Sequence, residues 1–428
     1  ALDPANNPQR LADTLIYVPN ARSRRALAKA LLEESGLSAL MMPDIRALGG
    51  LEEDEPPASA ETALADLPPA ISAAQRIGEL TTLVLAYYKA QGLSLPEVSA
   101  LAAARELAGL LDQAALSSEP GSGVDWSKLN SLVSDTQLAH HWEQSLQFLN
   151  IITKDWPAKL DDAKAMDPYA RRLGAAEAIA RSWADAPPET PVIIAGSTGA
   201  TPASRLMMRS VLTLPRGLIV LPGLDRDLPD AALQTLRDEP SHPQYALIGA
   251  LSALQRTSAS VPEWPGLDLS KSLTARQRLM HETLAPADQT ADWTQRLRSL
   301  AADGDSAAFV NEALDGLQLI EPADDTDEAG IAALLMRETL EHEHETAALV
   351  TPDTGLARQV SARLKAWGIE VEPSAGIPLI QSDQGSYLAL AVEWLSEPDH
   401  PVKLMAILRH GLSRFDREAV LIIDKQIL

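Results

Sequence analysis

The segment from Pro191 to Pro229 constrains the fold of this chain more than any other. It contains two short apolar runs, Val192–Ala195 and Leu218–Leu221, with a stretch between them that is long enough for one helix. Pro and Gly bound both runs, which is typical of buried parallel strands. Two parallel strands joined by a crossover helix are the repeating unit of α/β proteins, so the sequence predicts an α/β fold.

The turns that follow these two runs decide what chemistry such a sheet could perform. Open α/β sheets bind ligands beyond the carboxyl ends of their strands, and those ends carry Ser197–Gly199 and Gly223–Asp227. The first turn lacks the Lys of a phosphate-binding GxxxxGK[ST] loop. No acidic pair ends the first strand, so no carboxylate would hold Mg²⁺ there. We expect a sheet of the nucleotide-handling type without its catalytic groups.

Length and charge narrow the class of protein. A chain of 428 residues is too long for one hydrophobic core, so two or more domains are expected. The formal net charge of −23 argues against nucleic-acid binding over the whole surface, although it is compatible with a local basic groove. The chain has no Cys, no signal-peptide pattern and no apolar run of about 18 residues, which together favour the cytoplasm and no membrane contact.

A helical insertion is predicted between two parts of one sheet. Leu15–Val18 is a strand that Pro19 ends, Met41–Ala47 can form another short strand, and an acidic, Pro-rich linker follows. From Ile71 to Ala186 the pattern is helical, and the strands after Pro191 then return to the sheet. Part of the insertion carries one apolar stripe with steps of three and four: Leu138, Trp142, Leu146, Leu149, Ile152 and Trp156.

An internal echo predicts a second α/β unit. LIYVPNARSRRALAKALLEESGL, which begins at Leu15, resembles ALVTPDTGLARQVSARLKAWGI, which begins at Ala348. Each copy is a strand, a Pro, an Asx helix cap, a helix and a Gly. A helix is expected over Glu328–His342, and the second copy's strand is expected over Ala347–Thr351. We therefore expect two superposable α/β units, with the helical insertion outside both sheets.

Short motifs in a fixed order connect the chain to a known family. They are GVDW at Gly123–Trp126, HWEQSLQFLNIITKDWP at His141–Pro157, MDPYARR at Met166–Arg172, AGSTGATPAS at Ala195–Ser204, LPRGLIVLPGLDRDL at Leu214–Leu228, HPQYALIGAL at His242–Leu251 and SAGIPL at Ser374–Leu379. These motifs resemble the N-terminal region of AddB, the B subunit of the AddAB helicase–nuclease, in its alphaproteobacterial form. The resemblance covers nearly the whole chain, and the HW…FL…WP pattern is specific.

The resemblance implies a superfamily-one helicase-like fold that has lost its motor. It implies two RecA-like parallel-sheet domains, the first interrupted by an all-helical insertion. Gly196–Gly199 stands where an active helicase carries acidic Walker-B residues. The implied boundaries are 1–69 and 187–235 for the first RecA-like domain, 70–186 for the insertion, 236–326 for a mixed helical and loop connection, and 327–428 for the start of the second domain.

Three parts of the family pattern are absent from this sequence. The first strand with its phosphate loop would lie before Ala1, and the nuclease groups would lie after Leu428. The iron–sulfur cysteines of some members are missing, so no cofactor is expected on these residues. The chain does not begin with Met and stops within the apolar run Val420–Leu428, which predicts a piece of a longer protein.

Basic faces on two helices are candidates for DNA contact. On the first helix the face is Arg22, Arg25 and Lys29, opposite Leu27 and Leu31. These cations could contact phosphates, and a solvated helix face is the alternative interpretation. The second helix offers a weaker pair on the face opposite Val360 and Leu364, namely Arg358 and Lys365.

Hydroxyl groups at a helix N-terminus form a third candidate. Ser197, Thr198 and Thr201 could donate hydrogen bonds to a nucleic-acid backbone, or they could simply cap the helix that begins at Pro202. The turn Asp225–Asp227 is either a remnant of a helicase coupling motif or a surface turn, and the second interpretation is favoured.

The His and Trp residues have ordinary interpretations. His342 and His344 are two residues apart, and His140 and His141 are adjacent, whereas a helical zinc site needs a spacing of four. Trp142 and Trp156 lie on the apolar stripe, so core packing is expected rather than base stacking. No Ser, His and Asp set has a supporting motif for nucleophilic catalysis.

The combined expectation is a non-catalytic, helicase-like segment of a bacterial ATP-dependent helicase–nuclease subunit. Such a segment would serve double-strand-break repair by homologous recombination, as a scaffold and a channel that scans single-stranded DNA for a hotspot sequence. Its implied partners are single- and double-stranded DNA and the AddA motor subunit, with which it would form a heterodimer. Two alternatives stay open: an interaction scaffold without DNA contact, which the acidic charge favours, and a nucleotide-processing α/β enzyme that uses the Gly196–Gly199 turn.

Overall fold

The computed structural model describes residues 8–51, 56–117, 139–226, 228, 230–266, 269–286, 292–301, 304–374, 376 and 378–426, and for residues 117, 139–144, 230, 231 and 426 it describes the backbone alone. The chain forms two compact units, Ala1–Asp315 and Gly316–Leu428. Glu52–Glu55 of the predicted acidic linker, the motif Gly123–Trp126, and the stripe residue Leu138 lie outside the described residues, as does the Trp142 side chain.

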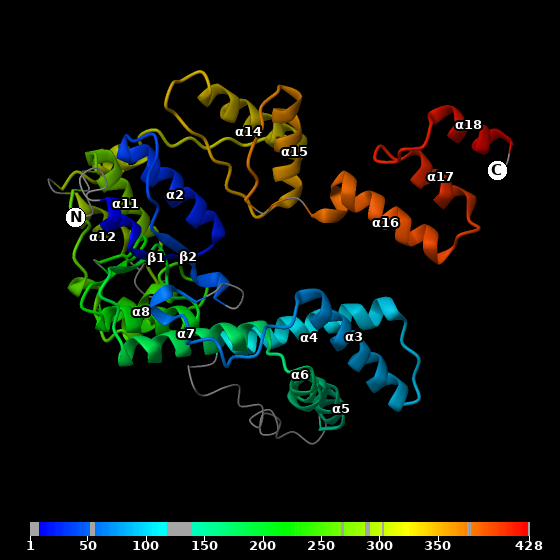
Figure 1. Ribbon diagram of the computed structural model, residues 1–428. Coiled ribbons are helices and arrows are strands. Elements are labelled where there is room, and N and C mark those ends of the chain that lie inside the picture. The colour runs from blue at the N-terminus through cyan, green and yellow to red at the C-terminus, as the bar shows by residue number, and fades with distance from the viewer. Residues whose placement is uncertain are drawn as a thin grey trace. The chain divides into compact units, whose positions relative to one another are not determined.

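A four-stranded parallel sheet organises the first unit (Figure 1). The strand order is β2-β1-β3-β4, and Leu15 of β1 pairs with Val192 of β3, as predicted. The two apolar runs after Pro191 are therefore neighbouring parallel strands of the sheet that Leu15 begins. The strands are β1 (Leu15–Val18), β2 (Asp44–Ala47), β3 (Val192–Ala195) and β4 (Gly217–Val220), and the predicted crossover helix is α8 (Pro202–Thr213).

One face of the sheet packs against α8 and α7 (Pro168–Asp185). Alternate strand residues such as Tyr17 and Ile194 point into this core, where they meet the helix residues Trp183 and Met207. The rings of Tyr17 and Trp183 make an edge-to-face contact with centroids 6.4 Å apart. Because these side chains are at most 1% exposed, this layer is the main hydrophobic core of the unit.

Helix α2 (Ala21–Ser35) covers the opposite face of the sheet (Figure 1). It begins where predicted, because the Asn20 side chain accepts a hydrogen bond from the Ser23 N–H at 2.9 Å, and it ends at Gly36 with a left-handed φ of 65°. Leu27 and Leu31 are half-buried, and none of the residues of α2 is fully buried. Helix α2 therefore packs on β1 and β2 through partly buried side chains only.

The predicted helical insertion has its own core. Its elements are α3 (Ala73–Ala90), α4 (Glu97–Ser117), α5 (Ala139–Asn150), a π-helical turn (Ile151–Asp155) and α6 (Trp156–Ala163). Leu80, Val84, Ile152 and Trp156 are buried together there, which confirms core packing for Trp156. The prediction that everything up to Ala186 lies outside the sheet layers is wrong for α7. That helix buries an apolar face at helical spacing, Ala175, Ile179 and Trp183, against the sheet.

A buried charge cluster ties the insertion to α7. Arg76 of α3 is 7% exposed and pairs with Asp112 of α4 at 2.8 Å and with Asp167, the N-cap of α7, at 2.9 Å. Trp156 Nε1 also donates to Asp167 at 3.3 Å. Burial raises the pKa of the Asp167 carboxyl above its ordinary value, and the attraction of Arg76 opposes that rise only in part. Removing Arg76 would leave the buried Asp167 carboxylate without its cation.

The rest of the first unit is mainly short helices, as the mixed pattern predicted. They are α1 (Pro8–Ala12), α9 (Asp230–Leu236), α10 (Tyr245–Ala253), α11 (Lys271–Thr283), α12 (Trp293–Leu300) and α13 (Ser306–Leu314). Ala275, Leu279, Phe309 and Ala313 form a small separate core between α11 and α13. Helix α10 instead packs against α8, so it closes one end of the sheet layer.

The second unit is helical in its described residues. Its helices are α14 (Asp325–Thr339), α15 (Thr354–Ala366), α16 (Asp383–Ser396), α17 (Pro401–Arg409) and α18 (Arg417–Gln426). Helix α14 confirms the helix predicted over Glu328–His342, although it begins and ends three residues earlier, and α15 confirms the capped helix of the echo. The expected strand Ala347–Thr351 does not form, and Val350 is 93% exposed. A parallel strand needs a neighbour to receive its hydrogen bonds, and the described residues of this unit provide none.

None of the helices in the described part of the chain combines the length and the apolar character that crossing a bilayer would require.

Candidate functional site

The strand order places a topological switch point between β1 and β3. The connection from β1 leads through α2 to β2 on one side, and the connection from β3 leads through α8 to β4 on the other. Right-handed crossovers then put α2 and α8 on opposite faces of the sheet, as Figure 1 shows. In open α/β sheets the crevice beyond the carboxyl ends of the strands at such a point is where ligands bind.

The turns at this edge are packed tightly together. Gly49 N donates to Pro19 O at 3.1 Å, and Gly196 N donates to Val220 O at 2.9 Å. Gly196 has a left-handed φ of 77°, and a Cβ at that position would lie 3.7 Å from the Pro19 ring. The carboxyl ends of all four strands are therefore linked, and Pro19 occupies the space beside the first turn.

Hydroxyl side chains accept hydrogen bonds from two backbone N–H groups of the turn Gly196–Thr201, those of Gly199 and Thr201. The Gly199 N–H donates to Ser197 Oγ at 3.2 Å, and Ser197 is only 6% exposed. Thr201 and Ser204 form a reciprocal capping box, with Ser204 N donating to Thr201 Oγ1 and Thr201 N donating to Ser204 Oγ, both at 3.1 Å. Of the three predicted hydroxyl groups, Thr198 is the one that makes no hydrogen bond with described residues.

Neighbouring side chains fill the space in which such a turn would hold a phosphate. Arg205 folds back from α8 and donates to the Gly199 carbonyl oxygen at 3.2 Å. A Cβ at Gly199 would lie 2.6 Å from the Cβ of Ala250, so α10 packs directly on the turn. A phosphate-binding loop needs free N–H groups around an open nest, and this turn is closed.

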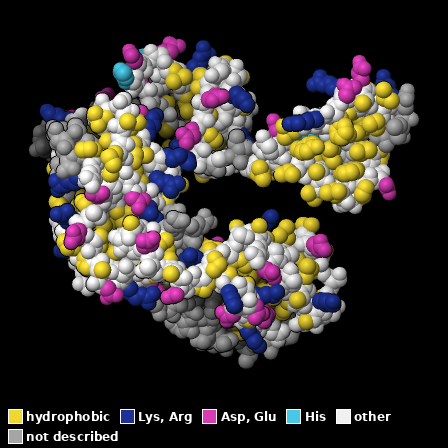
Figure 2. Space-filling model, viewed as in Figure 1, with side chains coloured by type: hydrophobic (Ala, Val, Ile, Leu, Met, Phe, Trp, Pro, Cys, Tyr) yellow, Lys and Arg dark blue, Asp and Glu magenta, His cyan; other side chains and the backbone are white. Residues whose placement is uncertain are grey.

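Helix α2 presents the predicted basic face. Arg22, Arg25 and Lys29 are all exposed, and Figure 2 shows Lys and Arg side chains gathered along this helix. Arg24 is exposed as well and was not predicted, because its position lies closer to the apolar side of the helix. Lys29 makes an ion pair with Glu33 at 3.7 Å, and both side chains are largely exposed. This pair therefore leaves the positive charge of the face accessible to solvent.

Two side chains hold the turn after β4, those of Gln244 and His281. Asp225 is 4% exposed, so its interpretation as a surface residue is wrong, while Asp227 lies outside the described residues. The Gln244 side chain accepts from Asp225 N at 3.1 Å and donates to Gly223 O at 2.8 Å. His281 of α11 pairs with the Asp225 carboxylate at 3.1 Å.

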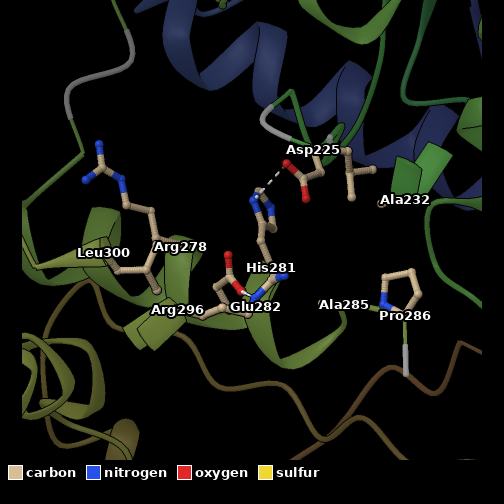
Figure 3. Close-up of a pocket in the computed structure, with 10 residues that line it drawn as sticks. Asp225, Ala232, Arg278, His281, Glu282, Ala285, Pro286, Arg296 and Leu300 are labelled. Atoms are coloured by element: carbon tan, nitrogen blue, oxygen red, sulfur yellow. Dashed lines mark hydrogen bonds and ion pairs between the residues drawn. The ribbon is translucent and has the colours of Figure 1, made fainter. Parts of the chain in front are cut away.

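A small pocket of about 60 Å³ lies beside this Asp225–His281 pair (Figure 3). Its polar lining also includes Glu282, which pairs with Arg296 of α12. Each of the two carboxylates has a cationic partner or a His partner, so the lining as a whole is close to neutral. Sequence reasoning missed His281, because a single His in a helix gives no sign of a partner 56 positions away.

The second basic pair lies on α15. Arg358 and Lys365 are exposed, and Val360 and Leu364 on the other side are buried, as predicted. Arg358 Nε donates to the Thr354 carbonyl at 3.3 Å, so part of its guanidinium is already used within the helix.

Two arrangements that suggest catalysis have structural explanations. His410 Nε2 lies 3.0 Å from Ser386 Oγ, but His410 Nδ1 accepts from Leu412 N–H at 3.2 Å. Nε2 then carries the proton and donates it to Ser386, so it cannot act as a base towards that hydroxyl. His342 and His344 are exposed beyond the end of α14. Within the described part of the chain, no three His, Asp or Glu side chains converge as metal ligands would.

Comparison with known proteins gives this chain no family. No protein-family model matches it, and no curated protein matches it either.

Proposed function

We propose that this chain is a non-catalytic, helicase-like segment that binds single-stranded DNA along the carboxyl edge of its parallel sheet. In this proposal it belongs to a helicase–nuclease of double-strand-break repair, and a partner subunit resembling AddA supplies the motor. The motif order from Gly123 to Leu379 supports the family, and the interrupted sheet supports the architecture. The strand that would complete a second RecA-like sheet at Ala347–Thr351 is not formed, so the proposal rests on the first unit.

The observation that carries the proposal is the exposed basic face of α2. Arg22 and Arg25 lie in the first two turns of the helix, which begins at the switch-point edge of the sheet. Their charges are exposed although the chain as a whole carries −23. Exposed Arg and Lys on one helix face bind phosphates by charge and read no sequence. A single strand that follows the edge of the sheet would therefore meet this face first.

The closed turn after β3 argues against the alternative of a nucleotide-processing enzyme. Its Gly199 and Thr201 N–H groups donate to Ser197 and Ser204, and Arg205 donates to its Gly199 carbonyl oxygen. Phosphoryl transfer requires an open phosphate site, a Lys that contacts the phosphates and a carboxylate that holds Mg²⁺. Neither the sequence nor the geometry of this turn offers them, which favours binding over turnover.

A salt titration of DNA binding tests the proposal against the pure scaffold. The affinity of the 428-residue chain for a labelled single strand is measured at increasing salt, for the wild type and for the triple variant Arg22→Ala, Arg25→Ala, Lys29→Ala. The slope of log affinity against log salt is negative, and each lost phosphate contact makes it less steep by about 0.7 for single strands, so the triple variant should flatten it by about 2. Circular dichroism checks that the variant is folded.

The matched control removes three exposed cations from the helical insertion: Lys89→Ala, Arg105→Ala and Lys154→Ala. This control changes the net charge by the same amount, and its slope and affinity are expected to stay close to those of the wild type. Equal losses in the two triple variants would mean that net charge, and not the face of α2, determines binding. No binding by the wild type at low salt would favour the scaffold.

A further inference from the structure

Trp264 is an exposed aromatic side chain in the loop between α10 and α11. It is 60% exposed, although Trp is among the residues whose burial stabilises a protein most. Pro262 and Pro265 stand on either side of it and restrict the backbone of the loop. The side chain is therefore held on the surface by a stiff segment.

The loop contacts the turn after β4, at the carboxyl edge of the sheet. Arg226, in the turn after β4, pairs with Glu263, the residue directly before Trp264. That turn is itself fixed, because Asp225 pairs with His281 (Figure 3). The Asp225 N–H also donates to the Gln244 side chain. Ordering an aromatic group in advance lowers the entropy that a ligand must lose on binding.

The loop that carries Trp264 and the start of α2 belong to the same edge of the sheet. The turn that carries Arg226 follows β4, and α2 follows β1, two strand positions away in the order β1-β3-β4. Parallel strands are spaced by about 4.8 Å, so the two strand ends lie roughly 10 Å apart along the same edge. One strand of DNA that follows this edge could contact both elements.

We infer that Trp264 stacks against an unpaired base of the single strand whose phosphates lie on α2. This inference rests on the proposed function and adds to it the part of the ligand that the cations of α2 do not contact. Stacking on an aromatic ring tolerates any sequence, since every base has a π-face. Because Glu263 beside Trp264 is paired with Arg226, this pair offers phosphates no free positive charge, and the ring of Trp264 offers a base its apolar face.

The test compares Trp264→Ala with the wild type on two ligands, a labelled oligo(dT) and an abasic strand with the same number of phosphates. Loss of one stacked base is expected to weaken oligo(dT) binding by about 5- to 140-fold. The salt slope should stay unchanged, because stacking releases no counterions. Binding of the abasic strand should also stay unchanged, and Trp264→Phe should restore most of the affinity for oligo(dT).

The matched control is Phe415→Ala, which removes an aromatic side chain that is also 60% exposed but belongs to the second unit. It should leave the binding of both ligands unaffected.

If Trp264→Ala leaves oligo(dT) binding unchanged while the α2 triple variant weakens it, the inference is wrong and the proposed function stands. Equal weakening on both strands also overturns the inference, since no base is then involved. If the wild type binds neither strand, both proposals fail. Because Trp264 is 60% exposed, its truncation should leave the fold intact, and circular dichroism checks this.

Discussion

Helices α2 and α15 begin with the same sequence pattern and are held in different ways. Each follows a Pro and an Asx cap, and each is followed by a Gly with positive φ, 65° at Gly36 and 75° at Gly368. Helix α2 follows a strand of the sheet and buries none of its own residues. Helix α15 follows no strand, but it buries Leu356, Val360 and Leu364 against α14.

This difference separates what a local pattern determines from what the surroundings determine. The cap, the helix and the Gly depend on contacts within a few residues, so they appear in both copies. The strand depends on neighbouring strands, which the first copy has and which the described residues of the second unit do not provide. Helix α2 buries none of its residues fully and presents exposed cations, and we propose that these cations bind DNA.

The largest expected effect is a difference in packing energy between the two helices. Leu364→Ala should lower the free energy of unfolding of the second unit by about 2–5 kcal/mol, because Leu364 is 1% exposed and its removal leaves a cavity. Leu31→Ala on α2 should cost less than about 1 kcal/mol, because Leu31 is half-buried.

Hydrogen exchange in peptides from each helix, read at increasing urea, measures the two effects separately. Leu364→Met keeps the volume and serves as the control, with an expected cost under about 1.5 kcal/mol. Equal costs for the two Ala variants would mean that α2 is packed as firmly as α15, and the two helices would then not differ in how they are held.

The elements that sequence predicted best are those with local causes. The apolar runs bounded by Pro and Gly gave β1, β3 and β4 to within one residue at each end, and the Asx caps gave the starts of α2 and α15. The strand at Ala347–Thr351 has the same apolar pattern, but a pattern does not provide a partner. Helix α7 was assigned to the insertion, because continuity of helical pattern does not reveal which core a helix joins.

In the candidate site, too, the features with local causes could be predicted and those that depend on distant contacts could not. The basic face of α2 follows from helical spacing alone, and the structure leaves it exposed. The contacts of Asp225 with His281 and Gln244 join residues that are far apart in sequence, so no spacing rule could find them. The closure of the Gly196–Thr201 turn by Arg205 and Ala250 likewise depends on how α8 and α10 pack.

An intermediate effect is expected from the two caps, and it should be similar in both helices. Asn20→Ala removes the acceptor of the Ser23 N–H, and Asp353→Ala removes the acceptor of the Gly355 N–H. Each should destabilise the first turn of its helix by about 1 kcal/mol. The cost at Asp353 should be higher by a few tenths, because its negative charge also favours the helix N-terminus.

Hydrogen exchange of the first turn measures the cap effect, with Asn20→Asp and Asp353→Asn as variants that keep an acceptor. Both should retain most of the protection of the wild type. A cap deletion that loosened the whole of α15 but only the first turn of α2 would show that the two starts are not equivalent.

The smallest expected effect concerns the charge that distinguishes α2. Glu33 pairs with Lys29 at 3.7 Å, in an exposed i,i+4 pair whose order, Lys before Glu, is the weaker one, so the pair contributes about 0.3 kcal/mol or less. Glu33→Gln should therefore change stability by only a few tenths of a kcal/mol, because it loses this pair but also removes a negative charge from the C-terminal turn. Its effect on single-strand binding should be an increase in affinity of about two- to fivefold at low salt, since a like charge at about 4 Å from a phosphate costs roughly 1 kcal/mol in water.

Glu34→Gln is the matched control. Glu34 is exposed on the same turn and makes no ion pair with described residues, so its removal should change DNA affinity less. If the two variants increase affinity equally, the effect belongs to the net charge of the helix, and Lys29 is not among the groups that meet the strand.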